Sequence, residues 1–317
     1  MIEQKGITKK FAAGTSAIGY QKDAAAKRRK YRNILLFGVI ALVVLIVYFV
    51  FVLGNSSSIA GPFKEGNRVF YWMLFVGFVA ELVAGSMGMG YGVICTTVLL
   101  LLNIPLPVIS ASIHSAESFT SAASSISHYK LGNVNKKLIR MLALPAVFGA
   151  VTGALLLTYV GRDYAIMVKP VIAAYTMYLG IQILRNAFAR KKTLSFKKKI
   201  NIPLLGFAGG FIDSFGGGGW GPLVTGTFIK NGRTPRYVVG SSIVSKFILT
   251  FASAVTFIFT IGIHHWNIVA GLLMGGIVAA PFSAMLASKL PVRKMYFIVG
   301  SLVIIMGLIS IYKTLFL

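Results

Sequence analysis

Long apolar runs separated by short polar loops cover most of the chain after residue 32. A helix crosses the hydrocarbon core of a bilayer, about 30 Å thick, with roughly 20 apolar residues. Several runs reach this length, and no long polar stretch follows residue 70. The pattern therefore predicts an all-α polytopic membrane protein without a soluble enzymatic domain. The expected apolar segments are 33–53, 69–86, 92–103, 106–127, 141–160, 165–188, 202–215, 221–229, 236–262, 268–288 and 295–315.

Some of these segments are interrupted rather than simply short. The ones too short to cross a bilayer comfortably are 92–103, 202–215 and 221–229. Each borders a glycine-rich break, either Gly85–Gly92 or Asp213–Gly221. We therefore expect two glycine-broken helical hairpins, 69–103 and 202–229. The sequence leaves open whether they are re-entrant or span the membrane fully.

The charge distribution predicts the orientation of these segments. The chain has 32 Lys and Arg against 7 Asp and Glu, a formal net charge of +25, and is 56% hydrophobic with a mean hydropathy of +0.79. In a soluble protein such an excess suggests nucleic-acid binding, but here the basic residues lie in tails and short loops, as in cytoplasmic loops of membrane proteins. We expect no nucleic-acid partner, a location in the cell (inner) membrane, a cytoplasmic N-terminus and a C-terminus outside. The loops expected inside are 1–32, 128–140, 185–199, 230–236 and 289–294, and those expected outside are 54–68, 161–164 and 264–267.

The predicted inside and outside positions of the loops imply two inverted repeats, each a glycine-broken hairpin followed by three spanning helices. An offset of about 129 residues aligns Gly88, Gly90, Tyr91 and Gly92 with Gly217, Gly219, Trp220 and Gly221, and Glu117 with Lys246. The predicted divisions are 1–32, a basic cytoplasmic arm; 33–66, an extra N-terminal transmembrane span and outer loop; 67–199, transmembrane repeat 1; and 200–317, transmembrane repeat 2. The first run exceeds the apolar core of a signal peptide, about 7–15 residues, so we expect an uncleaved span. The segment Ser58–Ala60 leaves processing of residues 1–60 open.

The two glycine breaks are candidates for an anion site. Irregular backbone at membrane depth is tolerated where it lines a polar cavity. A new helix is expected to start at about Gly92 and at about Gly221, and a helix start offers free N–H groups and about half a positive charge. If the two hairpins enter the membrane from opposite faces, the N-terminal ends of both new helices can contact one small anion. The expected substrate-binding residues are Ser86, Gly88, Gly90, Tyr91, Gly92, Ser214, Gly217, Gly218, Gly219, Trp220, Gly221, Ser242 and Lys246.

The alternative is that these glycines only allow close helix packing. Packing motifs of that kind are expected at Gly149-x-x-x-Gly153, Gly206-x-x-x-Gly210 and Gly271-x-x-x-Gly275.

Ionisable side chains inside predicted spans are costly and usually functional. Lys246 lies near the middle of its run and could compensate an anion. We expect His114, Glu117 and Asp213 to carry a coupled proton or ion. Alternatively, Glu117 and Lys246 form a structural pair between the repeats, and Asp213 satisfies backbone donors. The single Cys95 excludes an intrachain disulfide and a cysteine metal cluster, and we expect no catalytic residue, metal site or cofactor.

The segment Gly85–Gly92, the run Asp213–Pro222 and the serines around 241–245 resemble the sulfite exporter TauE/SafE (TSUP) permeases. The resemblance covers roughly residues 69–317. It implies transport of a sulfur-containing or organic anion, such as sulfite, thiosulfate or a sulfonate, across the cytoplasmic membrane.

We therefore expect a secondary transporter, proton- or ion-coupled, that works by alternating access. A passive anion channel is the near alternative. An intramembrane enzyme is disfavoured because the chain lacks a His-Glu-x-x-His motif and a convincing serine-protease arrangement. The expected partners are a small anionic substrate and membrane lipid, and a homodimer is left open. The anion, the direction of transport and the coupling ion are not readable from the sequence.

Overall fold

The computed structural model describes residues 66–102, 104–188, 199–262, 265–286 and 292–316. The chain divides into two units, Met1–Leu45 and Ile46–Leu317, and all described residues belong to the second. The predicted basic arm and first span lie outside the described residues.

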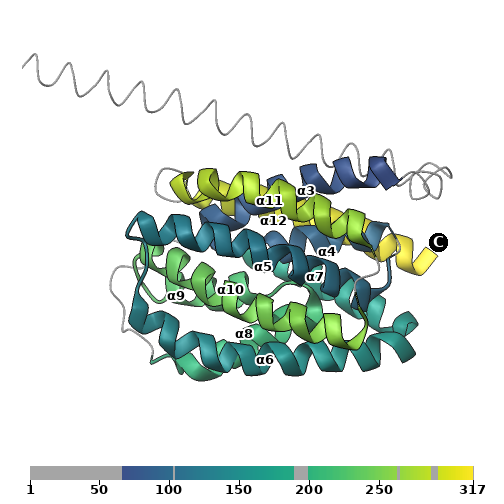
Figure 1. Cartoon of the computed structure of the whole chain (residues 1–317), viewed down its shortest axis with the longest axis horizontal. Helices are drawn as coiled ribbons and strands as arrows, with labels where there is room; N and C mark the ends of the chain where they lie inside the picture. Colours follow the sequence, from purple (N-terminus) through teal and green to yellow (C-terminus); the bar gives the residue numbers. More distant parts are fainter. Residues whose placement is uncertain (1–65, 103, 189–198, 263–264, 287–291, 317) are drawn as a thin grey trace, which may run out of the picture. The chain divides into compact units, whose positions relative to one another are not determined.

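The described residues form helices and contain no strand (Figure 1). The elements are α3 (Gly66–Met87), α4 (Tyr91–Leu101), α5 (Leu106–Lys130), α6 (Lys136–Asp163), α7 (Ala165–Phe188), α8 (Ile202–Gly216), the π-helical turn η2 (Gly221–Thr225), α9 (Gly226–Lys230), α10 (Pro235–Thr260), α11 (Trp266–Leu286) and α12 (Val292–Phe316). Among them, five helices are long and apolar enough to cross a membrane, namely α3, α6, α7, α10 and α11. This confirms the prediction of a polytopic all-helical chain.

Helix α5 is as long as the apolar helices but more polar. It spans 25 residues and carries serines, His114 and Glu117, nearly all of them buried. Its hydroxyls bond mostly to carbonyls of the preceding turn, as Ser118 does to Ser115 at 2.8 Å. Such internal bonds satisfy polar groups that lipid cannot. Helix α5 packs against α10, and this contact forms the polar centre of the bundle.

Glycines bring two pairs of helices into close contact. Helix α3 packs against α11, and α6 against α8. A Cβ on Gly275 would strike the Leu74 carbonyl of α3, and a Cβ on Gly210 would strike the Ala146 carbonyl of α6. Small residues permit this approach of two backbones. The predicted packing motifs therefore act in packing, and the glycine breaks are separate from them.

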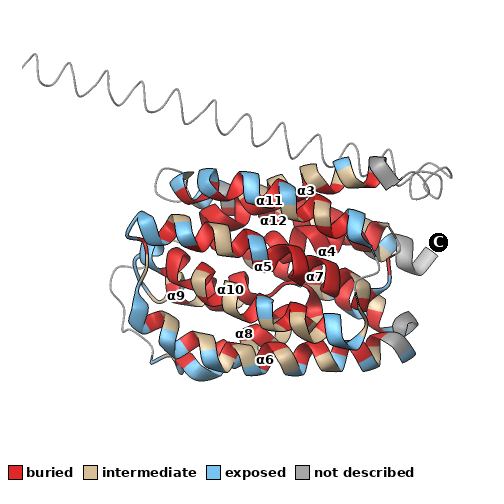
Figure 2. Ribbon diagram, viewed as in Figure 1, coloured by how far each residue is buried: buried red, intermediate tan, exposed pale blue. Residues whose placement is uncertain are grey.

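The interior and the periphery differ in chemistry. Helix α4 is buried along its whole length, whereas the outer helices show exposed positions (Figure 2). Many exposed side chains are large and apolar, including Phe259 at 86% and Met167 at 72% exposure. Such a surface is unfavourable in water and suited to lipid.

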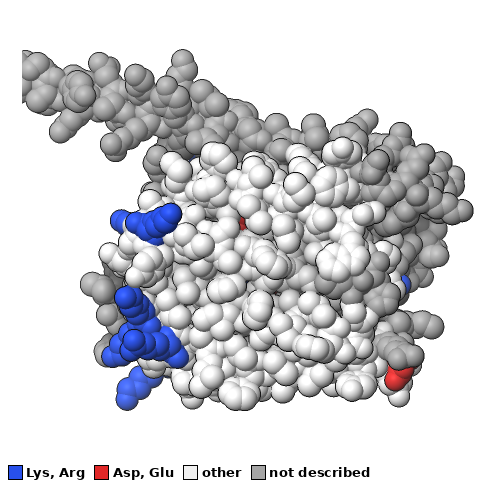
Figure 3. All heavy atoms as spheres, viewed as in Figure 1, with Lys and Arg blue, Asp and Glu red and all other residues white. Residues whose placement is uncertain are grey.

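Lysines and arginines gather at one end of the described bundle, the end where α9 lies (Figures 1 and 3). Helices α5 and α9 end there, and α6 and α10 begin there. The basic residues at these ends are Lys130, Lys136, Lys137, Arg140, Lys230, Arg233 and Arg236. They belong to the loops predicted to face the cytoplasm.

Candidate anion site at the two glycine breaks

Each break requires glycine because the backbone turns through the left-handed region. Helix α3 ends at Met87, and α4 starts at Tyr91 after Gly88 (φ 72°) and Gly90 (φ 113°). Helix α8 ends at Gly216, followed by Gly217 (φ 67°), and helical structure resumes at Trp220. Residues with a Cβ rarely adopt this conformation. The new helices start one residue earlier than the sequence suggested.

The two hairpin tips contact each other directly through reciprocal bonds. Thr96 Oγ1 of α4 donates to the Gly217 carbonyl of the second break at 2.7 Å. Thr225 Oγ1 of η2 donates to the Gly88 carbonyl of the first break at 3.0 Å. The two donors, Thr96 and Thr225, stand 129 positions apart in the sequence, and so do the two acceptors, Gly88 and Gly217.

Glycine is also needed where the tips touch. A Cβ on Gly92 would strike the Gly217 carbonyl, and one on Gly221 would strike Met89. The two helix starts are therefore close together and buried. In this state they pack against each other rather than around an open passage.

At the second tip, a side chain of the protein already occupies the helix start. Asp213 Oδ1 accepts hydrogen bonds from the N–H groups of Gly219, at 2.7 Å, and Trp220, at 2.8 Å. Asp213 is 1% exposed. Its carboxylate therefore caps this helix start as an anionic ligand would. Tyr175 fixes the same tip by donating to the Gly218 carbonyl at 3.0 Å.

His114 faces the other oxygen of this carboxylate. Its Nδ1 lies 2.8 Å from the Ser110 carbonyl, which can only accept, so Nδ1 carries a hydrogen. Nε2 lies 3.8 Å from Asp213 Oδ2 and has no hydrogen-bond partner. A neutral ring would therefore turn a lone pair toward the carboxylate, whereas a protonated ring would turn an N–H toward it.

Lys246 and Glu117 form a buried ion pair between α10 and α5. Lys246 Nζ lies 2.5 Å from Glu117 Oε1, while Glu117 Oε2 has no hydrogen-bond partner. Nearby, Glu81 of α3 accepts a hydrogen bond from Ser124 at 2.5 Å. We call Glu81, His114, Glu117, Asp213 and Lys246 the central ionisable cluster. It holds three carboxylates, one ammonium and one imidazole.

A small cavity lies beside the first tip, next to this cluster. Its volume is about 10 Å³, room for about one water. The residues that line it are Glu81, Ala84, Gly85, Gly88, Met89, Glu117, Ser121, Ile243 and Lys246.

All residues of the predicted site are buried, but not all reach this cavity. Ser86 donates to the Val83 carbonyl at 2.9 Å, and Ser214 bonds to Ser253 at 2.5 Å. Ser242 accepts from the Trp220 indole at 2.8 Å and bonds to Thr225. These hydroxyls brace the tips in the present structure.

Three contributors lie outside the predicted site. Glu81, which precedes the first break, is recognisable from the sequence as an acidic residue in an apolar run, but it was not among the predicted site residues. Thr96 and Thr225 were also missed, although they occupy matching positions at the offset that aligned the glycines.

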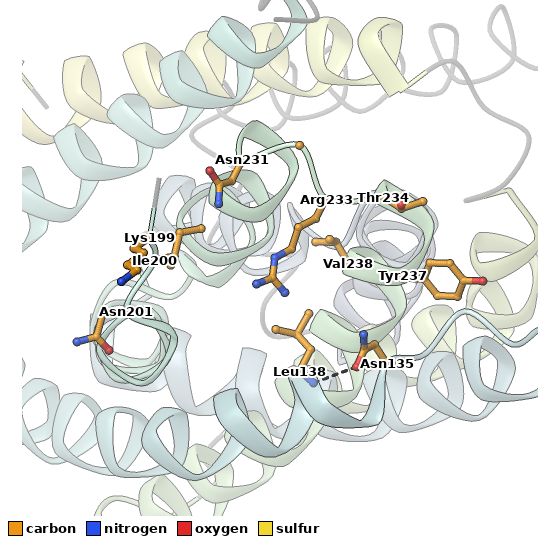
Figure 4. Close-up of a pocket in the computed structure, with 11 residues that line it drawn as sticks. Asn135, Leu138, Lys199, Ile200, Asn201, Asn231, Arg233, Thr234, Tyr237 and Val238 are labelled. Carbon is orange, nitrogen blue, oxygen red and sulfur yellow. Dashed lines mark hydrogen bonds between the residues drawn. The ribbon is translucent and has the colours of Figure 1, made fainter. Parts of the chain in front are cut away.

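A larger cavity of about 920 Å³ opens at the basic end of the described bundle. Figure 4 shows Arg233 projecting toward the middle of its lining, with Lys199 and Asn201 on one side and Leu138 and Asn135 on another. Its guanidinium also lies over the Phe228 ring, 4.8 Å from the centroid. The cavity therefore presents positive charge at the end of the bundle that carries most described basic side chains.

A bundle of apolar helices with two broken hairpins and a buried ionisable cluster has the features of a membrane transporter. The chain belongs to the sulfite exporter TauE/SafE family, which matches residues 73–309.

Three relatives have names that describe transport. The chain is 39% identical over 242 residues to "Probable membrane transporter protein YtnM" of Bacillus subtilis (strain 168), covering 74% of this chain and 79% of the relative. It is 24% identical over 225 residues to "Probable membrane transporter protein YdhB" of the same organism, covering 69% and 91%. It is 30% identical over 223 residues to "Probable membrane transporter protein ORF9" of Sinorhizobium sp, covering 66% and 80%. No solved structure matches the chain.

Proposed function

We propose that the chain is a secondary transporter for a small sulfur-containing or organic anion, such as sulfite, thiosulfate or a sulfonate. The observation that carries the proposal is the meeting of two broken hairpins beside the buried ammonium of Lys246. Helix starts and a buried cation both favour a negative ligand. The family description, which names sulfite export, supports an oxyanion.

The proposal includes an inverted repeat. Helices α4 and α5 start at Tyr91 and Leu106, and their proposed counterparts start 129 positions later, at Trp220 and Pro235. The packing follows the same exchange, because α3 with α11 corresponds to α8 with α6. Rocking of one half against the other around a fixed central site is the usual use of this plan.

The proposal also includes coupling to protons. Buried charges without partners are costly in a low-dielectric interior. The central ionisable cluster holds more potential negative than positive charge when His114 is neutral, and an arriving anion adds to that imbalance. Uptake of a proton by Glu117 or His114 offsets it. Cotransport of the anion with a proton is therefore favoured over passive conduction.

We assign the basic end to the cytoplasm, in keeping with the retention of Lys and Arg on that side. The large cavity at this end would then be the inner approach to the site. Arg233 and Lys199 would raise the local concentration of anions there. In this orientation, the N-terminus is cytoplasmic and the C-terminus is outside.

The experiment is transport by the full chain in proteoliposomes. Labelled sulfite, thiosulfate and a sulfonate are offered with and without a proton gradient. We expect saturable flux, accumulation against the anion gradient driven by the proton gradient, and loss of flux in Lys246→Met. Flux that only dissipates gradients would support a channel, and no flux of any offered anion would reject the proposal.

A further inference from the structure

The two halves of the site differ at two positions that decide where a ligand fits. In the second half, the Asp213 carboxylate fills the helix start and His114 faces it. The offset of 129 positions assigns Ala84 to the place of Asp213 and Ile243 to the place of His114. Ala84 and Ile243 both line the small cavity. The cavity is therefore the counterpart, in the first half, of the space that the Asp213–His114 pair fills in the second.

We propose that the anionic head of the substrate binds in this cavity, in the first half only, and that the Asp213 carboxylate shows how it is held. This inference rests on the proposed function, and it assigns the ligand to one of the two helix starts. The class of ligand is a small oxyanion that offers at least two oxygens, such as a carboxylate, a sulfonate or sulfite.

The backbone donors follow from the comparison of the halves. Gly219 and Trp220 give their N–H groups to Asp213, and their counterparts are Gly90 and Tyr91. No side chain caps the start of α4 at Gly90. Gly90 and Tyr91 adjoin the lining residue Met89 but do not themselves line the cavity in this structure. Once the cavity widens, an oxyanion beside Ala84 would accept from these two N–H groups, as Asp213 does from theirs.

The side chains that line the cavity supply a second, independent indication that an anion binds there. Glu117 is 2% exposed and lines the cavity, and its Oε2 has no hydrogen-bond partner. Lys246, also in the lining, is bound to the other oxygen of Glu117. When Glu117 takes up a proton, Oε2–H can donate to the anion and the ammonium can turn to it. The anion and the proton then enter together with no net change in buried charge.

Other titratable groups lie around the Glu117–Lys246 pair. Those that face the Glu117–Lys246 pair are Glu81 of α3, Tyr91 and Cys95 of α4, His114 of α5 and Asp213 of α8. The step itself adds one proton for one anion, so the net buried charge stays the same whether Glu117 or His114 takes up the proton.

The cavity must widen before it can hold an oxyanion, since about 10 Å³ accommodates only about one water. Met89 stands in its wall, at the position that corresponds to Gly218. A methionine side chain is unbranched and repacks readily. In the present structure the cavity is therefore too small for an oxyanion.

The direct test gives the first half its own carboxylate. In Ala84→Asp, the new side chain is expected to occupy the site, so that saturable anion flux in proteoliposomes falls by about tenfold or more. Gly132→Asp, which adds the same carboxylate at an exposed turn with open space around it, is the control and should keep flux within about twofold of the wild type. Wild-type flux and apparent KM in Ala84→Asp would overturn the inference.

The converse test removes the Asp213 carboxylate from the helix start in the second half. Asp213→Ala is expected to lose thermal stability, and added formate or acetate should restore part of it, because the exposed N–H groups regain a carboxylate. The wild type should show no comparable response to these two anions at the same concentrations. An Asp213→Ala protein that formate and acetate leave unchanged would contradict the inference that such a helix start takes a free carboxylate.

A labelling test remains informative even if Ala84→Asp does not fold. In a Cys95→Ala background, the thiol introduced by Ala84→Cys is expected to react about tenfold more slowly with a small anionic methanethiosulfonate when transported anion is present. The thiol of Thr234→Cys, in the large basic-end cavity, is the control and should not be protected. Equal labelling of Ala84→Cys with and without the anion would overturn the site. Absence of wild-type flux would instead reject the proposed function, so the two failures are distinguishable.

Discussion

The Lys246 ammonium lies 2.5 Å from the Glu117 carboxylate, and the two residues stand 129 positions apart, at equivalent places of the proposed repeat. One position of the proposed repeat has thus become acidic in one half and basic in the other. Two identical charges facing each other at the centre would repel, whereas opposite charges attract. The resulting ion pair links α5, which carries Glu117, to α10, which carries Lys246.

This ion pair should show strong coupling in a double-mutant cycle. Lys246→Met leaves the Glu117 carboxylate buried without its partner and is expected to cost about 3–5 kcal/mol. Glu117→Gln added to Lys246→Met should recover much of this loss, because no charge is left buried. Thermal unfolding in detergent measures all four proteins, and additive effects of the two substitutions would contradict the coupling.

The reciprocal threonine bonds should contribute about equally. Thr96→Val and Thr225→Val each leave a buried glycine carbonyl without its hydroxyl donor, at an expected cost of about 1–3 kcal/mol. Thr97→Val is the control, because Thr97 Oγ1 bonds to Val93 within its own helix. Unfolding midpoints should fall in both former variants and much less in the control. A large effect in only one of the two would show that the bonds are not equivalent.

The contact of α6 with α8 should fail when a glycine gains a branched side chain. Gly210→Val places methyl groups against the Ala146 carbonyl, so the two helices must separate. We expect little folded protein by size-exclusion chromatography. Gly132→Asn is the control, because Gly132 is exposed, has open space around it, and has a φ of 66° that Asn tolerates. Normal yield of Gly210→Val would refute the proposed tight packing.

The His114 ring should link transport to pH. His114→Gln keeps a hydrogen-bonding side chain but removes the imidazole of the central ionisable cluster. The flux of the variant should therefore vary less with pH than wild-type flux. His265→Gln, at an exposed position before α11, should leave the pH profile unchanged. Identical profiles for the wild type and His114→Gln would exclude His114 as the coupled group.

The basic-end cavity should affect capture of the anion rather than its translocation. Arg233→Gln removes a positive charge from the lining, so the apparent KM should rise about three- to tenfold with kcat unchanged. High salt should reduce the difference between variant and wild type, because it screens exposed charges. A lower kcat with unchanged KM would assign Arg233 to another step.

Much of this arrangement could be predicted because glycine and helix length leave clear signals. The breaks at Gly88 and Gly217, the short helices that follow them and the packing glycines such as Gly275 lie where the sequence indicated. Hydrogen-bond partners were harder to predict, because they depend on the rotation of each helix about its axis. The bond of Ser124 to Glu81 is one such case. The role of Asp213 in satisfying backbone donors was among the expectations, but the sequence did not say that Gly219 and Trp220 would supply those donors. Periodicity places a residue on a helix face but does not say which neighbour it meets.

The crossed bonds from Thr96 and Thr225 also constrain how the protein can open. Each hairpin supplies a donor to the other and an acceptor for it, so neither hairpin can withdraw without breaking both bonds. In the proposed alternating-access cycle, opening toward either face of the membrane would begin by breaking the same two bonds. The strength of these bonds would then contribute to one barrier shared by both directions of transport.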